Sequence, residues 1–414
     1  MLLRARIVLP VSRPPLSDGA VQIEGNRIIT VRPWKRFAAA ERRSATDLGE
    51  VILLPGLVNA HCHLDYTNMA GLLAFSRRFT DWIKSITALK AGWSYTDFAE
   101  SWLAGAKMLL RNGTTTVADI EAVPELLPDV WSSTPLRVHS LLELICIRPG
   151  LSPRNLVADS LKLLDSLPAG CGGIGLSPHA PYTTTGELLS RAAAAARRRH
   201  LPVAIHVAES DAEFEMFRRA RGPLFDWFKT QRDCSDCGGV SPVQHLARNG
   251  VLGPRTLAIH ANYLAPGDIE LLARHRTHVV HCPTSHDYFG HEPFPIERLL
   301  RAGVNICLGT DSLASTRRER GRKPELDLRN EMRTLAADRP GLAPAELLRM
   351  ATANGAAALG LRRRLGEVSA RARADLIAIN HAGSIAEAFE AVIHSEGPVA
   401  ASMIDGGWTL KPAP

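Results

Sequence analysis

Short apolar runs alternate with amphipathic segments through the middle of the chain. Each run is rich in β-branched and aliphatic residues and has the length of one buried strand. Eight such runs are predicted as strands: Val51–Val58, Thr114–Ala118, Leu136–Leu144, Gly173–Leu176, Pro202–Ile205, Thr256–Ile259, His278–Val280 and Val304–Leu308. Helices are predicted between them, for example Phe98–Arg111, Leu156–Leu167, Gly186–Arg199, Pro266–Arg274 and Pro295–Ala302. Eight strands separated by helices indicate an α/β fold with a parallel sheet, and the count favours a closed (β/α)8 TIM-like barrel.

The two ends of the chain have a different pattern, of short strands joined by tight turns. Glu24-Gly25-Asn26 is typical of a hairpin turn between two apolar runs. The strands predicted here are Leu3–Leu9, Ala20–Glu24, Arg27–Val31, Asp375–Ile379, Met403–Ile404 and Trp408–Leu410. We therefore expect the two termini to build one small sheet domain together.

Histidines and an aspartate follow four of the predicted barrel strands. His61 and His63 end the first strand, and residues at i and i+2 of an extended chain point to the same side. His206, His260 and Asp311 each follow another apolar run. The carboxyl ends of barrel strands meet at one face, where catalytic groups lie. Any one of these residues alone could be an unrelated polar group, but together they suit a divalent metal with a site open for water.

Composition and charge exclude some classes of function. The chain has 414 residues, of which 45% are hydrophobic and 22% charged, as in an ordinary globular protein. Its formal net charge is +7, but the basic residues are scattered along the sequence, so we expect no nucleic-acid partner. The positive excess would favour an anionic small molecule. Because no apolar run reaches about 18 residues, no transmembrane helix and no membrane partner are expected.

The cysteines and the N-terminal segment indicate a cytoplasmic protein. The seven cysteines are an odd number and several lie inside predicted strands, which is typical of reduced thiols. The apolar start MLLRARIVLP is interrupted by Arg4 and Arg6 and is too short for a secretory signal. Cys234 and Cys237 form a CxxC, but no second CxxC exists to complete a zinc knuckle, so a surface loop is the simpler interpretation.

An ordered set of motifs spans nearly the whole chain. The motifs are LPGLVNAHCH (54–63), SPHAPYT (177–183), HVAES (206–210), IHANYL (259–264), HCPTS (281–285), LGTDSLAS (308–315), MATANGAAALGL (350–361) and LGEVSARARADLIAIN (365–380). With these motifs in this order, the chain resembles the amidohydrolase superfamily, and within it the metal-dependent cytosine-deaminase-like and chlorohydrolase-like branch. The resemblance implies a hydrolase with a (β/α)8 barrel over residues 55–361. It also implies a small β-sandwich built from residues 1–54 and 362–414.

The resemblance further implies one metal ion. Its ligands would be His61, His63, His206 and Asp311. His260 would lie beside the bound water and polarise the substrate. Binuclear relatives carry a lysine after the fourth strand, where this chain has SPHAPYT with His179. We therefore expect a single divalent metal, with zinc favoured and iron or manganese left open by the ligand types.

Glu209 distinguishes between the reactions of this branch. It follows His206 by three residues, the HxxE spacing of the deaminases that the chain resembles. A carboxyl beside the metal can carry a proton from the attacking water to a ring nitrogen, which simple amide hydrolysis does not require. A solvated loop carboxylate is the alternative. Asp311 and His260 would take and orient the proton of the water. The HxxE spacing of Glu209 therefore predicts a hydrolytic deaminase that releases ammonia.

Four further residues are expected to contact the substrate. They are His179, Arg148, His286 and Trp82. An arginine at this face of the barrel could bind a carboxylate or phosphate, and Trp82 could stack on a ring. Each has a structural alternative: a hydrogen-bonded histidine at a strand end, a solvated arginine, a packed loop around His286 and a core tryptophan. The basic residues of segment 317–323 are interpreted mainly as a solvated cluster.

The expected partner is a small-molecule substrate, an adenine-type purine or nucleoside. The segments HLDYTNMAG and FTDWIKS are similar to those of aminodeoxyfutalosine deaminases, whose substrate carries a benzoate that an arginine could bind. Two other classes stay open. One is a chlorohydrolase or a cyclic amide or urea hydrolase of the same fold, and the other is a metal-free binding barrel. A homodimer is also left open.

Overall fold

The centre of the molecule is a closed parallel barrel. The structure is a computed structural model that describes residues 1–148, 150–168, 170, 172–317 and 323–412. Within these residues the barrel strands lie side by side in chain order: β6 (Leu57–Cys62), β7 (Thr114–Glu121), β8 (Arg137–Leu144), β9 (Gly173–Pro178), β10 (Val203–Val207), β11 (Thr256–His260), β12 (His278–His281) and β13 (Ile306–Leu308). The backbones of Cys62 and Asp311 form a parallel β-bridge, and the Thr310 N–H donates to His61 O at 3.0 Å. These contacts join the last strand to the first. The expected (β/α)8 barrel is therefore confirmed.

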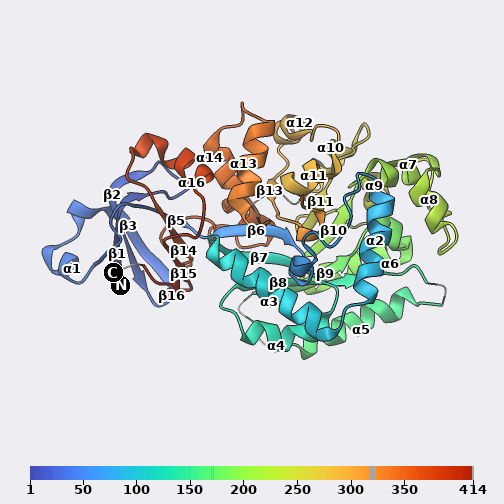
Figure 1. Cartoon of the computed structure of the whole chain (residues 1–414), viewed down its shortest axis with the longest axis horizontal. Coiled ribbons are helices and arrows are strands. Elements are labelled where there is room, and N and C mark those ends of the chain that lie inside the picture. Colours follow the sequence, from blue (N-terminus) through green and yellow to red (C-terminus); the bar gives the residue numbers. More distant parts are fainter. Residues whose placement is uncertain (149, 169, 171, 318–322, 413–414) are drawn as a thin grey trace.

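Helices cover the outside of this barrel (Figure 1). In α3, the Ser94 hydroxyl caps the N-terminus by accepting from the Asp97 N–H, and Trp102 and Leu109 are buried on the inner face. The helices that belong to the barrel are α2 (Phe79–Ala91), α3 (Tyr95–Arg111), α4 (Leu127–Ser132), α5 (Pro153–Ser166), α6 (Gly186–Arg199), α7 (Asp211–Arg219), α8 (Pro223–Phe228), α9 (Pro242–Arg248), α10 (Asp268–Arg274), α11 (Pro283–Phe289), α12 (Ile296–Arg301), α13 (Leu328–Asp338), α14 (Pro344–Met350) and α15 (Ala353–Ala358). In the described ranges, no helix combines the length and the apolar character that crossing a bilayer requires.

The two chain ends meet in a separate mixed sheet, at the left of Figure 1. Its strands are β1 (Leu2–Val8), β2 (Leu16–Glu24), β3 (Arg27–Pro33), β4 (Thr46–Asp47), β5 (Val51–Pro55), β14 (Leu376–Asn380), β15 (Ala401–Ile404) and β16 (Gly407–Leu410), with short helices α1 (Ala39–Arg43) and α16 (Ala388–His394). β14 pairs antiparallel with β5 and so joins the C-terminal strands to the N-terminal ones. The small domain built from both termini is thus confirmed. The boundaries 1–54, 55–361 and 362–414 stay a prediction.

A largely buried ion network, of which Asp405 is the partly exposed member, ties this terminal sheet to the barrel. Arg137 is the first residue of β8, and its Nη2 lies 3.1 Å from Asp375 Oδ2 and 2.8 Å from Asp405 Oδ2. The Asp405 N–H also donates to Asp375 Oδ1 at 2.9 Å. A guanidinium can bind two carboxylates at once, because its donors point in several fixed directions. The sheet is therefore fixed against the amino ends of the barrel strands.

The predicted strand Val51–Val58 is wrong as one element. The structure divides it into β5, which belongs to the terminal sheet, and β6, which belongs to the barrel. The break is at Gly56, where a Cβ atom would lie 2.1 Å from Thr115 Oγ1. Only glycine allows the backbone so close to a neighbouring strand at this junction.

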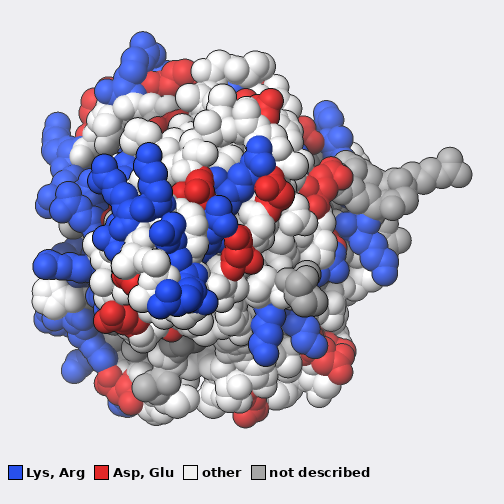
Figure 2. All heavy atoms as spheres, turned by 90° about the vertical axis from the view of Figure 1, so that its left-hand side faces the viewer, with Lys and Arg blue, Asp and Glu red and all other residues white. Residues whose placement is uncertain are grey.

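Basic side chains that are scattered along the sequence gather at one end of the molecule. Figure 2 views this end, the terminal sheet, and shows lysine and arginine side chains over much of the face. The exposed basic residues of the N-terminal segment are Arg6, Arg13, Lys35, Arg36, Arg42 and Arg43. Because β5 leads directly into β6, this sheet lies at the amino ends of the barrel strands. The basic residues of this end are thus remote from the face where the strands end.

Candidate metal centre and active site

Five predicted site residues meet at the carboxyl ends of the barrel strands. His61 lies in β6 and His63 directly follows that strand. The other three are His206 of β10, His260 at the end of β11 and Asp311 after β13. The nitrogens of His61, His63 and His206 lie within 4.8 Å of one another, and so do the ligand atoms of His61, His260 and Asp311. His63 Nε2 lies 3.3 Å from His206 Nε2, and His61 Nε2 lies 3.5 Å from Asp311 Oδ1.

The donor set fits a divalent metal. Burial and neighbouring imidazoles hold the pKa of His63 and His206 well below the usual value, so both rings are neutral at pH 7. Neutral imidazole is the form that binds a metal. The Nε2 atoms of His61 and His260 are buried without a hydrogen-bond partner among the described residues. Buried polar atoms normally have partners, so a metal centre accounts for their arrangement.

Asp311 supplies the negative charge of this cluster. Burial opposes its ionisation, but the imidazole of His61, 3.5 Å away, and the proximity of His260 and His63 hold the pKa of Asp311 well below the usual value. The carboxylate is therefore ionised at neutral pH. Three imidazoles and one carboxylate match the ligand set predicted from the sequence, whose individual roles stay a prediction.

Glu209 lies at the edge of the cluster. Its Oε1 is 3.6 Å from His260 Nε2, and the residue is only 6% exposed. Burial raises the pKa of Glu209 well above its usual value, and the nearby carboxyl groups of Asp311 and Glu213 raise it further. Glu209 is thus held in the protonated form, which can donate a proton to a bound molecule.

A cavity of about 230 Å³ opens beside the cluster. Its walls are mainly apolar and aromatic, with a few polar groups at fixed places, as in many sites for small organic ligands. The residues that line it include His63, Tyr66, Trp82, Ile83, Ile86, Lys90, Glu143, Ile145, Ile147, His179, Tyr182, His206, Glu209, Trp227, Phe228, Gln231 and Asp311. The predicted residues Trp82, His179, Glu209 and Asp311 therefore share one cavity with two of the clustered histidines.

The remaining predicted substrate residues divide into two groups. His179 borders the cavity, its Nδ1 lies 2.8 Å from Thr183 Oγ1, and burial lowers its pKa to about 3. Trp82 presents its ring to the cavity and donates from Nε1 to Ala314 O at 3.3 Å. Arg148 and His286 are not among the described residues that line the cavity. Their contact with substrate stays a prediction.

Two residues of the cavity with ionisable side chains, Lys90 and Glu143, were missed by the sequence reasoning. Lys90 donates a hydrogen bond to the Tyr66 hydroxyl, and the Tyr66 ring stacks on His63 with centroids 5.0 Å apart. Glu143 is buried, which raises its pKa, while Lys90 acts in the opposite direction. Lys90 could have been found, because Trp82, Ile86 and Lys90 follow each other at i+4 spacing on one face of α2.

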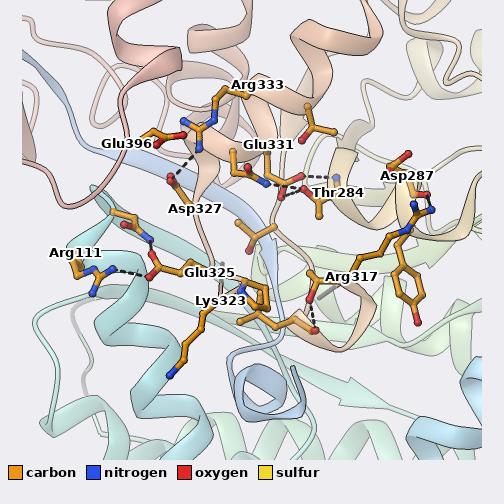
Figure 3. A pocket seen from close by; sticks show the side chains of 18 of the residues that line it. Arg111, Thr284, Asp287, Arg317, Lys323, Glu325, Asp327, Glu331, Arg333 and Glu396 are labelled. Atoms are coloured by element: carbon orange, nitrogen blue, oxygen red, sulfur yellow. Dashed lines mark hydrogen bonds and ion pairs between the residues drawn. The ribbon is translucent and has the colours of Figure 1, made fainter. Parts of the chain in front are cut away.

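A second cavity, of about 660 Å³, is lined in part by the segment that follows β13 (Figure 3). Some of its charged side chains have partners within its wall: Arg111 Nη2 is 2.6 Å from Glu325, and Glu331 accepts from the Thr284 N–H at 2.8 Å. Burial raises the pKa of Glu331 to about 8. The clustered histidines are not among its described lining residues, so the smaller cavity is the candidate active site.

The basic segment 317–323 is only partly described. Arg317 donates to Asp287 O at 3.2 Å, at the rim of the larger cavity. Residues 318–322 lie outside the described residues, so the interpretation of Arg318, Arg320 and Arg322 as solvated is not tested. Cys234 and Cys237 are partly buried free thiols in the loop after α8, as the sequence favoured.

Comparison with known proteins agrees with this architecture. The chain is 34% identical to a 5-methylthioadenosine/S-adenosylhomocysteine deaminase of Syntrophobacter fumaroxidans, over 87% of this chain and 80% of that protein. It is 30% identical to a 5'-deoxyadenosine deaminase of Methanothermobacter thermautotrophicus, over 87% and 81%. Among solved structures, an adenosine deaminase of Xanthomonas campestris with bound zinc has a TM-score of 0.81 and 26% identity, covering 99% of this chain and 92% of that one.

A more distant solved structure supports the fold alone. The aminofutalosine deaminase of Helicobacter pylori has a TM-score of 0.86 at 18% identity, covering 99% of this chain and all of that one (100%). A family model described as the amidohydrolase family matches residues 52–409. This match includes every barrel strand, β14, β15 and all but the last residue of β16. The chain therefore belongs to the amidohydrolase family.

Proposed function

We propose that this protein is a zinc-dependent hydrolytic deaminase of an adenine-type nucleoside, which releases ammonia. The observation that carries the proposal is Glu209, a buried carboxyl with a raised pKa, 3.6 Å from His260 on the wall of the cavity. A protonated carboxyl at this place can protonate a ring nitrogen, the step that separates deamination of a heterocycle from amide hydrolysis. The relatives described as deaminases of adenine nucleosides support the same reaction.

A divalent metal would be held by four residues of the cluster. They are His61, His63, His206 and Asp311. When bound, the metal supplies Lewis-acid activation of a water molecule at neutral pH. Zinc is proposed because histidine and carboxylate ligands suit it and because the Xanthomonas campestris deaminase was solved with zinc bound.

Three side chains would then move or orient the protons. Asp311, ionised at neutral pH, accepts a proton from the water while His260 orients the attacking oxygen. The oxygen attacks the ring carbon that bears the exocyclic amine. Glu209 donates its proton to the adjacent ring nitrogen, and the proton on Asp311 passes to the exocyclic amine, which leaves as ammonia. As the carbonyl forms, the proton of the added hydroxyl returns to Glu209 and restores its protonated form. Each proton is accounted for by a named carboxyl of the chain.

The walls of the cavity would hold the planar base. Trp82, Trp227 and Phe228 line it with flat rings, and His179 is neutral and able to form a hydrogen bond. Aromatic walls exclude water, which strengthens the hydrogen bonds made inside. Lys90 and Glu143 would contact the polar groups of the sugar or of its substituent.

The test is an ammonia-release assay on the purified, zinc-loaded protein. The panel contains adenosine, 5'-deoxyadenosine, 5'-methylthioadenosine, S-adenosylhomocysteine and aminodeoxyfutalosine, with a chlorotriazine and a cyclic urea as probes for the rival hydrolases. We expect ammonia from at least one adenine nucleoside, with a kcat/KM in the range of about 10⁴ M⁻¹s⁻¹ or above. Chloride release or ring opening without any deamination of the nucleosides would overturn the proposal.

A further inference from the structure

The position of Glu209 depends on an unusual turn after β10. In an extended strand, residues three apart point to opposite faces, so His206 and Glu209 would not share one cavity. Ala208, between them, has a φ of 50°, in the left-handed region. This conformation redirects the chain and brings both side chains to the cavity. A left-handed residue other than glycine costs about 1–2 kcal/mol and persists only where its surroundings hold it.

Hydrogen bonds from two neighbouring elements hold this turn. On one side, Glu213 Oε2 of α7 accepts from the Glu209 N–H at 2.9 Å. On the other side, Asn262 Nδ2 donates to Glu209 O at 2.9 Å, and the Asn262 N–H donates to Ala208 O at 2.9 Å. His286 Nδ1 lies 3.1 Å from Asn262 Oδ1, which fixes the orientation of the Asn262 amide. The backbone of Glu209 is thus bonded at both its N–H and its carbonyl.

Neither packing nor capping of α7 requires a carboxyl at residue 213. The Glu213 side chain is fully buried, its Oε1 has no hydrogen-bond partner among the described residues, and burial raises its pKa to about 8. Burying a carboxyl is unfavourable unless its interactions compensate. The N-terminus of α7 is already capped, because Ser210 Oγ accepts from the Glu213 N–H at 3.2 Å. An apolar side chain of similar size would fill the same space at lower cost.

We propose that Glu213 is a positioning residue, which holds the backbone of Glu209 so that the Glu209 carboxyl stays beside His260. The proposal rests on the proposed function, in which Glu209 transfers protons. Without the Glu213 acceptor, the buried Glu209 N–H loses its partner and the turn can relax toward an extended chain. Displacing a catalytic group by about 1 Å can cost a hundredfold in rate, so we expect kcat to fall about 10- to 100-fold.

Three substitutions at one position separate the hydrogen bond from the presence of a carboxyl. Glu213→Gln keeps an oxygen that accepts the same N–H, Glu213→Leu removes it, and Glu213→Asp keeps a carboxyl but is one methylene too short. We expect Gln to retain kcat within about fivefold, and both Leu and Asp to lose about 10- to 100-fold with KM changed less than threefold. Glu215→Gln, on the same helix but at the surface and 2.6 Å from Arg221, is the matched control and should behave as wild type.

Hydrogen exchange gives a readout that does not depend on activity. In the zinc-loaded protein, the peptide containing residues 206–210 should exchange faster in Glu213→Leu and Glu213→Asp than in wild type or Glu213→Gln, while zinc content stays unchanged. If Leu fails to fold, the Asp and Gln variants still decide. Equal exchange and equal kcat in Asp, Gln and wild type would overturn the inference. If the exchange pattern is as expected but wild type deaminates no nucleoside, Glu213 still positions the Glu209 backbone, and only the proposed function is wrong.

Discussion

Glu209→Gln is the sharpest test of the proposed chemistry. Glutamine has nearly the same shape as glutamate but cannot give up or take a proton at neutral pH. Glu209 is not among the side chains that come within metal-binding distance of one another, so zinc should stay bound. The backbone of the turn is held by Glu213 and Asn262 rather than by the Glu209 side chain, so the fold should not change.

The size of the loss follows from the surroundings of the carboxyl. General acid–base catalysis contributes about a hundredfold to ten-thousandfold, which corresponds to about 2.7–5.4 kcal/mol of activation free energy. Glu209 is 6% exposed, so bulk water has little access to replace it as a proton donor. The other carboxyl of the cluster, Asp311, is ionised before the reaction and therefore cannot supply the proton that the ring nitrogen needs. We therefore expect kcat to fall at least a hundredfold, with substrate binding weakened much less.

Three measurements on one preparation decide the matter. They are zinc content by elemental analysis, kcat from ammonia release on the best nucleoside of the panel, and binding of that nucleoside or its product by calorimetry. Retained zinc and retained binding with a large loss of kcat agree with proton transfer by Glu209. A kcat within about fivefold of wild type, with zinc bound, would show that the reaction does not need this carboxyl, because general acid catalysis is worth far more.

Three further predictions concern the metal, the pH dependence and the domain junction. His61→Ala and Asp311→Ala should lose zinc and activity but keep the circular dichroism of wild type, and full zinc retention in both would contradict the ligand assignment. Burial raises the pKa of Glu331 from 4.5 to about 8, so its contribution to stability is complete below the lower value and is lost as pH rises through the higher one. In urea unfolding, Glu331→Gln should therefore gain stability relative to wild type as pH rises, by up to about 1.4 kcal/mol per pH unit, and an unchanged difference would refute this. Arg137→Met leaves the buried carboxyl of Asp375 without its guanidinium and should cost about 3–5 kcal/mol in the same assay, whereas a loss below about 1 kcal/mol would show that the network is not needed.

Much of the fold could be predicted because each barrel strand carries its own signal. A buried parallel strand is apolar on both faces, so a short apolar run between helical segments identifies it without long-range information. The division at Gly56 could not be predicted in this way. Both halves of Val51–Val58 are equally apolar, and only tertiary packing decides that the first half pairs with β14 and the second with β7.

The meeting of the histidines with Asp311 was predictable for a related reason, and so were Trp82, His179 and Glu209, but other polar residues of the cavity were not. A ligand at the end of a strand is positioned by the barrel itself, so chain order and residue type suffice. Lys90 and Glu143 reach the cavity through the orientation of α2 and the pleat of β8, which depend on packing between elements. Arg148 follows a strand as the ligands do, yet it is not among the described lining residues, since a loop residue is not held by the barrel. The homodimer and the absence of a nucleic-acid partner stay predictions.

Two carboxyl groups on one cavity are held in opposite states by their positions. Asp311 lies among the imidazoles, and although burial opposes its ionisation, the adjacent imidazole of His61 and the proximity of His260 and His63 lower its pKa. Glu209 lies at the edge of the cluster, where burial and the neighbouring carboxyls raise its pKa. One group is thus ready to accept a proton while the other is ready to donate one, which is the division that a deamination needs. Since the surroundings fix these states, exchanging the two residue types would not exchange their roles, and a carboxyl at the position of residue 209 would still be the acid.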